Sequence, residues 1–144
     1  MPLPHRLRTV FAVCFWAYGL FLLIATHAPA DDVQFIVRAA DYGLLDPDKL
    51  LHMAAYGVLG LLAALAYGGR WQTMKSAAIA LFAMLAVWGI VDELTQPLFG
   101  RLADANDFVC DLIGGAIGLA AGFAASRWLA ASRWLAASRW LARD

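Results

Sequence analysis

Residues 9–26 read TVFAVCFWAYGLFLLIAT, a run of eighteen residues without a charged side chain. A helix that crosses the hydrocarbon core of a bilayer needs about 20 mainly apolar residues, within a range of about 17–25. Further apolar runs follow at 47–67, 76–96 and 107–125. The 144 residues are 62% hydrophobic and 15% charged, whereas a soluble domain is about 45–50% apolar. The pattern therefore predicts four transmembrane helices.

The ends of the runs carry helix start and stop signals. Asp46 and Pro47 open the second run as an N-cap and a first helical residue. Gly68 ends that run, and Pro97 ends the third. Because the connections are short, consecutive helices should be antiparallel neighbours. The expected fold is an all-α, polytopic membrane protein built as a four-transmembrane-helix antiparallel bundle.

The charges alternate in sign from one gap between the runs to the next. One side collects eight of the eleven Lys and Arg residues, and the other collects ten of the eleven Asp and Glu residues. Cytoplasmic loops are rich in Lys and Arg. We therefore expect a multi-pass protein of the inner (cytoplasmic) membrane with cytoplasmic N and C termini. Membrane lipid is the expected partner, and nucleic acid is not.

The first run has an alternative interpretation as a secretory signal. Arg6 and Arg8 precede it, and Ala28-Pro29-Ala30 resembles a small-residue cleavage site. The apolar stretch is longer than the roughly 7–15 residues of a signal's hydrophobic region. We therefore expect the run to be retained as a membrane helix.

Two segments lie outside the four runs. Residues 28–46 are fairly apolar and favour a short interfacial helix. Residues 125–130 recur at 131–136 and 137–142. A six-residue step turns the helix by about 120°, so the repeated Trp side chains cannot form a single apolar face. We expect a transmembrane domain over residues 1–126 and a cytoplasmic repeat tail over 127–144.

Polar side chains inside the runs gather toward the outer end of each predicted span. A central charge costs about 2.5–3.5 kcal/mol on insertion scales, so these residues are the first candidates for a site. Spacings of three and four place them on common helix faces. The candidates for an outward-facing polar pocket are Lys49, His52, Tyr56, Asp92, Glu93, Gln96, Arg101, Asp107 and Asp111.

Carboxylates dominate this set, and several chemistries fit it. Crowded carboxylates repel one another, and protons, cations or a ligand relieve the repulsion. The set suits a lipid headgroup, a divalent metal bound through oxygens, or acid–base chemistry with His52. Helix capping and interhelical hydrogen bonding are the structural alternatives. No Cys/His metal spacing, phosphate loop or nucleophile elbow is present, so we assign no metal, cofactor or catalytic residue.

Small residues form a stripe on the fourth run. Gly114, Gly118 and Gly122 make two overlapping GxxxG steps. Residues at this spacing let helix backbones approach closely. The stripe predicts tight helix packing, either within the chain or between the protomers of a homo-oligomer.

Three short motifs in this order resemble the VanZ-like family of membrane proteins. They are Asp48-Lys49-Leu50-Leu51-His52 followed by Tyr56, then Asp92-Glu93-Leu94-Thr95-Gln96, and then Gly100-Arg101 followed by Asp107, Asp111 and Gly114-Gly115. Together they cover residues 46–122, so the resemblance leaves out the tail repeat. Asp111 stands where many members have Asn. The resemblance implies a small multi-helix membrane protein of the cell envelope, in a family named for a member linked to resistance to the glycopeptide teicoplanin.

The expected function combines the resemblance with the polar pocket. We expect the pocket to recognise a lipid-linked or cell-wall polar group, for example on a lipid-linked cell-wall intermediate. One alternative is a membrane lipid-phosphate hydrolase or transferase that uses His52 and a carboxylate. A second alternative is a structural membrane assembly module. A transporter is disfavoured because the inner half of each span is nearly free of polar groups.

Overall fold

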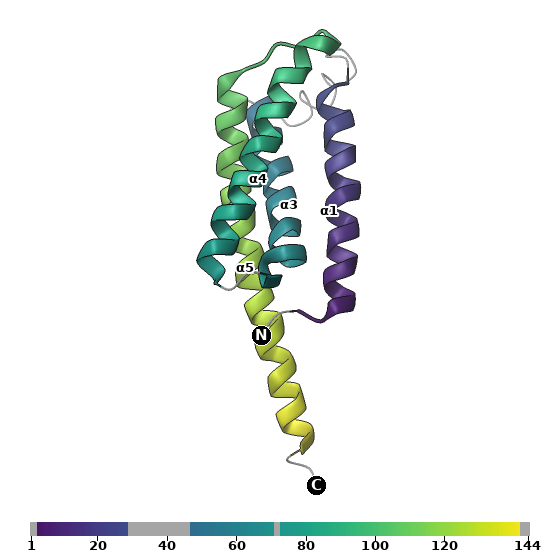
Figure 1. Ribbon diagram of the computed structural model, residues 1–144, viewed down its shortest axis with the longest axis vertical. Coiled ribbons are helices and arrows are strands. Elements are labelled where there is room, and N and C mark those ends of the chain that lie inside the picture. Colours follow the sequence, from purple (N-terminus) through teal and green to yellow (C-terminus); the bar gives the residue numbers. More distant parts are fainter. Residues whose placement is uncertain (1–2, 29–46, 71–72, 142–144) are drawn as a thin grey trace.

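The computed structural model describes residues 3–28, 47–70 and 73–141. Every regular element in these ranges is helical. The long helices α1 (His5–Thr26), α3 (Pro47–Tyr67), α4 (Met74–Thr95) and α5 (Ala105–Leu141) run alternately up and down the bundle (Figure 1). Each is long and apolar enough to cross a membrane. The predicted all-α antiparallel bundle is confirmed, and these helices are those of a multi-pass membrane protein.

The helix boundaries follow the local start and stop signals. α3 has the bounds predicted for it, Pro47–Tyr67, and the short 3-10 helix η1 (Gly68–Arg70) follows. α4 begins two residues before the predicted residue 76, because Thr73 and Ser76 form a reciprocal capping box. After α4 the chain continues as the 3-10 helix η2 (Gln96–Phe99). Gly100 then ends this turn with φ 78°, a left-handed conformation that favours glycine.

α5 is a single helix that extends beyond the other three helices (Figure 1). It crosses residue 126 without interruption, and the division there into a transmembrane domain and a cytoplasmic tail stays a prediction. By length and composition, its membrane-spanning part covers Ala105–Ser132. The interfacial helix expected at residues 28–46 falls in a segment of which only residue 28 is described, so that expectation lies outside the described residues.

The backbones of α3 and α5 are in direct contact along the glycine stripe. A Cβ atom added at Gly114 would overlap the carbonyl oxygen of Met53, and one at Gly118 would overlap that of Gly57. A Cβ atom at Gly122 would lie 2.7 Å from the carbonyl oxygen of Leu61. The glycines are buried within the chain, so the stripe serves packing between α3 and α5.

α1 packs against α3 through aromatic side chains and hydrogen bonds. Phe15 is fully buried in the core beside Leu59. Trp16 Nε1 donates to the hydroxyl of Tyr67 at 2.8 Å, and the Tyr18 hydroxyl donates to the carbonyl of Ala55 at 3.2 Å. Removal of α1 as a cleaved signal would strip these contacts from α3, so the packing favours retention of this helix.

The α3–α5 contact can be tested with Gly118→Ala. The new methyl group meets the Gly57 carbonyl oxygen, and overpacking of this kind costs about 1–3 kcal/mol. We expect a loss of that size in the free energy of unfolding, measured by unfolding in mixed detergent and SDS. Gly57→Ala is the matched control, because its added Cβ would lie an ordinary 3.5 Å from the nearest atom. Equal stability of the two variants would contradict the packing.

Candidate functional site

The predicted polar residues meet at one end of the bundle, here called the polar end. It is formed by the last turns of α1 and α4 and the first turns of α3 and α5, at the top of Figure 1. The expected open pocket is instead a buried group of side chains. His52, Tyr56, Asp92, Glu93, Gln96, Asp107 and Asp111 are each at most 7% exposed. We call these seven residues the polar cluster.

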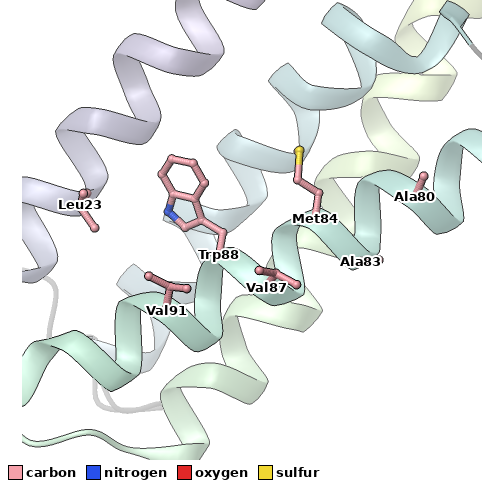
Figure 2. Close-up of a pocket in the computed structure, with 7 residues that line it drawn as sticks. All are labelled: Leu23, Ala80, Ala83, Met84, Val87, Trp88 and Val91. Carbon is pink, nitrogen blue, oxygen red and sulfur yellow. The ribbon is translucent and has the colours of Figure 1, made fainter.

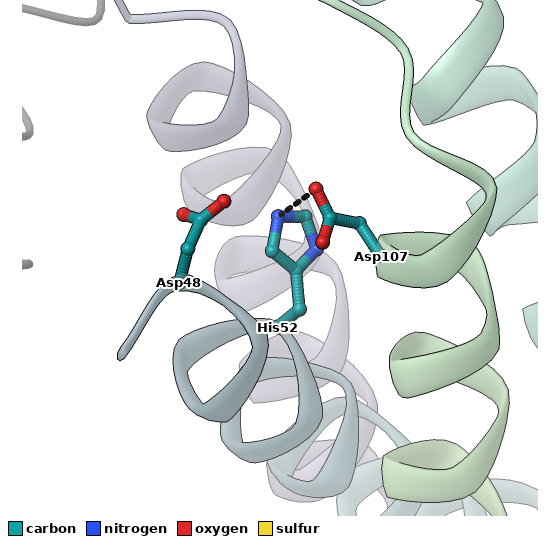
Figure 3. Close-up of side chains that lie close together, drawn as sticks. All are labelled: Asp48, His52 and Asp107. Atoms are coloured by element: carbon teal, nitrogen blue, oxygen red, sulfur yellow. Dashed lines mark ion pairs between the residues drawn. The ribbon is translucent and has the colours of Figure 1, made fainter. Parts of the chain in front are cut away.

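His52 joins α3 to α5 at the centre of the polar cluster. Its Nδ1 lies 2.9 Å from Asp111 Oδ1, so an ionised Asp111 accepts a hydrogen bond from the ring. Its Nε2 lies 3.9 Å from Asp107 Oδ2 (Figure 3). This position follows from the glycine stripe, because Asp111 precedes Gly114 by three residues on the same face of α5.

Asp92 joins α4 to both α1 and α3. The Thr26 hydroxyl donates to Asp92 Oδ1 at 2.6 Å, and the Tyr56 hydroxyl donates to Oδ2 at 3.3 Å. His27 Nδ1 is 3.6 Å from Asp92 Oδ1, and its Nε2 is 2.8 Å from the Thr95 hydroxyl. Thr26 and His27 were not predicted as site residues. The signal for them was present, because Thr26 ends the first apolar run and His27 follows it, at the same level as the other candidates.

Lys49 closes the polar cluster toward its surface. Its ammonium group lies 3.2 Å from Asp107 Oδ1 and 3.4 Å from Asp104 Oδ2. Asp104 precedes α5 and accepts a hydrogen bond from the backbone N–H of Asn106 at 2.8 Å. This N–H, and then the Lys49 ammonium, hold the pKa of Asp104 below its usual value. Asp104 therefore caps α5, and both Asp104 and Asp107 pair with Lys49.

Three buried atoms of the polar cluster lack a hydrogen-bond partner among the described residues. They are Glu93 Oε1, Gln96 Nε2 and Asp111 Oδ2. The other oxygen of Glu93 accepts from the backbone N–H of Asp104 at 2.9 Å. Buried polar groups are nearly always paired, so these atoms mark places where a ligand or ion can bind.

Lys49 borders the polar cluster, whereas Arg101, the other predicted site residue outside it, pairs with none of its carboxylates among the described residues. The half-buried side chain of Arg101 has no hydrogen bond or ion pair within the described ranges. Its backbone N–H donates to the Gln96 carbonyl at 3.3 Å, which fixes the chain in the turn after α4. Among the described residues, the Lys or Arg side chain that pairs with these carboxylates is Lys49.

An apolar groove of about 570 Å³ lies between α1 and α4 (Figure 2). It is lined by Leu23, Ala80, Ala83, Met84, Val87, Trp88 and Val91. Its upper end lies within one turn of the residues that meet at Asp92. Leu23 precedes Thr26, the donor to Asp92, by three residues in α1. Trp88 precedes Asp92 by four residues in α4, so the groove lies directly below that carboxylate along the helix.

The fold and the polar cluster are those of an integral membrane protein with a buried carboxylate–histidine cluster at one end of its helix bundle. Comparisons with known proteins give no match to a family model, to a curated protein or to a solved structure. The VanZ-like resemblance therefore stays a prediction that depends on the sequence motifs alone.

The link between α1 and the polar cluster can be tested with Thr26→Val. The variant removes the donor to Asp92, and hydrogen bonds between membrane helices contribute about 0.6–1.7 kcal/mol. We expect a loss of that size in the free energy of unfolding, and recovery with Thr26→Ser. Thr9→Val is the control, because that exposed hydroxyl donates only to His5 in its own helix. A Thr26→Val variant as stable as the control would contradict the role of this bond.

Proposed function

We propose that this protein is a VanZ-like membrane protein of the cell envelope that binds a lipid-linked polar group. In this proposal it lies in the inner membrane with cytoplasmic termini, and the polar end faces outward. The lipid chain occupies the apolar groove between α1 and α4, and the polar group lies against the polar cluster. The observation that supports this most strongly is the position of the groove one turn below Asp92, with Trp88 of its lining four residues before Asp92 in α4.

The groove has the chemistry that a lipid chain requires. Its lining is apolar, and Val87 and Val91 are 61% and 50% exposed. Trp88 Nε1 is buried without a hydrogen-bond partner in the described part of the chain. Trp88 lies four residues below Asp92, which is about 6 Å along the helix. Its N–H can therefore donate to an ester or phosphate oxygen of a lipid whose headgroup reaches Asp92.

The charge of the polar end favours a headgroup that carries an amine. Asp92, Glu93, Asp107 and Asp111 are buried there, with Asp104 beside them, and Lys49 is the ammonium ion paired with this set. An anionic group would be repelled by this excess of carboxylates, and an ammonium group would be attracted. Phosphatidylethanolamine and amine-bearing cell-wall intermediates have this chemistry.

Lipid selectivity provides the direct test. Native mass spectrometry of the full chain in detergent would compare retained phosphatidylethanolamine with retained phosphatidylglycerol. We expect a preference of about tenfold for phosphatidylethanolamine, equivalent to about 1.4 kcal/mol. Asp92→Asn should remove this preference, because it removes the charge nearest the groove.

The groove itself needs a matched pair of variants. Ala83→Trp places an indole in the groove and should abolish lipid retention. Ala120→Trp places the same group on an exposed position of α5 and should retain the lipid. Equal retention of both lipids by the unmodified chain, or by both tryptophan variants, would refute the proposal.

The family resemblance leads to a phenotype that can be measured separately. Bacterial cells that produce the protein should survive a higher teicoplanin concentration than cells with an empty vector. Asp92→Asn should lose this protection at an unchanged membrane abundance, because it changes the headgroup contact and preserves the side-chain shape. Protection by Asp92→Asn equal to that of the unmodified protein would separate the phenotype from the polar cluster.

A structural assembly role is the second candidate, and the hydrogen bonds of the polar cluster favour it. Thr26 and Tyr56 bond Asp92, and His52 bonds Asp111, so three helix pairs are joined by buried polar contacts. Such bonds hold membrane helices together. In this role, Asp92→Asn would lower abundance and thermal stability together, and lipid selectivity would be absent from the unmodified protein.

A further inference from the structure

We propose that the polar cluster binds a divalent transition-metal ion, for which Zn²⁺ is the probe, between His52, Glu93 and Asp111. One ligand atom from each of the three lies within 4.8 Å of the others, and all three side chains are buried. Imidazole nitrogen and carboxylate oxygen bind Zn²⁺ at about 2.0–2.2 Å in tetrahedral geometry, which places ligand atoms about 3.3–3.6 Å apart. Movement of the three side chains toward a common centre would therefore form the site.

A group of acidic residues does not by itself indicate a cation site. The second observation is a pair of buried carboxylate oxygens without hydrogen-bond partners among the described residues. They are Glu93 Oε1 and Asp111 Oδ2. The other oxygen of each carboxylate is already held, by the Asp104 backbone N–H at 2.9 Å and by His52 Nδ1 at 2.9 Å. Each carboxylate is thus fixed by one oxygen and has the other available for a metal. An unpaired buried acceptor is costly, and coordination would remove that cost.

A second triad, Asp48, His52 and Asp107, shares the same imidazole and also has ligand atoms within 4.8 Å (Figure 3). The charges around this second triad are less favourable to a metal ion than those around His52, Glu93 and Asp111. The Lys49 ammonium lies 3.2 Å from Asp107 Oδ1, so it both neutralises that carboxylate and repels a metal ion. The deeper triad contains Glu93 and Asp111, neither of which has an ion pair with Lys or Arg in the described residues. We therefore place the ion in the deeper triad.

Three protein ligands leave a fourth coordination position, as in zinc sites that bind water or a substrate. The ligands come from α3, α4 and α5, one from each helix. Metal binding would therefore join these helices as a single unit. This inference does not depend on lipid binding, because the lining of the groove includes none of His52, Glu93 and Asp111.

Metal binding can be measured on the full chain in detergent. The protein would be stripped with a chelator, incubated with Zn²⁺ and gel-filtered before inductively coupled plasma mass spectrometry. We expect about one equivalent of zinc and a rise in melting temperature. Glu93→Gln and Asp111→Asn should each weaken binding by at least about tenfold, the smallest loss usual even for residues that only support metal ligands.

Two matched variants separate this site from its neighbours. Asp107→Asn changes a carboxylate of the other triad and should keep zinc affinity within about threefold of the unmodified chain, a difference of less than about 1 kcal/mol. Ala83→Trp, which should lose lipid, should keep the zinc. Failure of the lipid proposal would thus leave this result unchanged.

The outcomes that would overturn the inference are specific. Zinc no higher than in a detergent blank, with no shift in melting temperature, would show that protons and not a metal satisfy these carboxylates. Loss of zinc in Asp107→Asn with retention in Asp111→Asn would also overturn it. If Asp111→Asn fails to fold, Glu93→Gln provides the test of the site. This variant should fold, because a Gln oxygen can still accept from the Asp104 N–H. Full zinc binding by Glu93→Gln would refute the site.

Discussion

The contact between the α3 and α5 backbones is the constraint on which the rest of the structure depends. Side chains larger than hydrogen at Gly114 and Gly118 would overlap carbonyl oxygens of α3. Because glycine is present there, the helices approach closely enough for His52 to reach Asp111, one turn before the stripe. The same approach directs the first turn of α5 toward Lys49 and Glu93. Without it, the carboxylates of α5 would lie too far from the histidine to pair with it.

Burial of this many polar groups has an electrostatic consequence. Charges removed from water need partners, and the bundle supplies them across helices. Thr26, Tyr56 and the Asp104 backbone N–H each complete part of a carboxylate's hydrogen bonding. The pairing is incomplete, because Glu93 Oε1 and Asp111 Oδ2 have no hydrogen-bond partner in the described part of the chain. Positive charge, on a metal ion or on an ammonium headgroup, is the ligand chemistry that this region favours.

Much of the fold and part of the site followed from local patterns in the sequence. The Pro47 start and the Gly68 stop predicted the bounds of α3, because such signals act between near neighbours. Spacings of three and four correctly grouped His52 with Tyr56 on one buried face. The contacts of Thr26 and His27 with Asp92 and Thr95 were missed, since they depend on how α1 lies against α4. The exclusion of Arg101 from the polar cluster also depends on the turn after α4.

The sequence by itself determined four membrane-length helices, their antiparallel order and the gathering of polar residues toward one end. These properties depend on apolar length and on signals within a few residues of each helix end. Only the tertiary structure decided that the polar residues form a buried cluster, that Lys49 pairs with Asp107, and that an apolar groove lies between α1 and α4. The reason is geometric: these contacts join residues 36–66 positions apart, and only the relative placement of whole helices sets their distances.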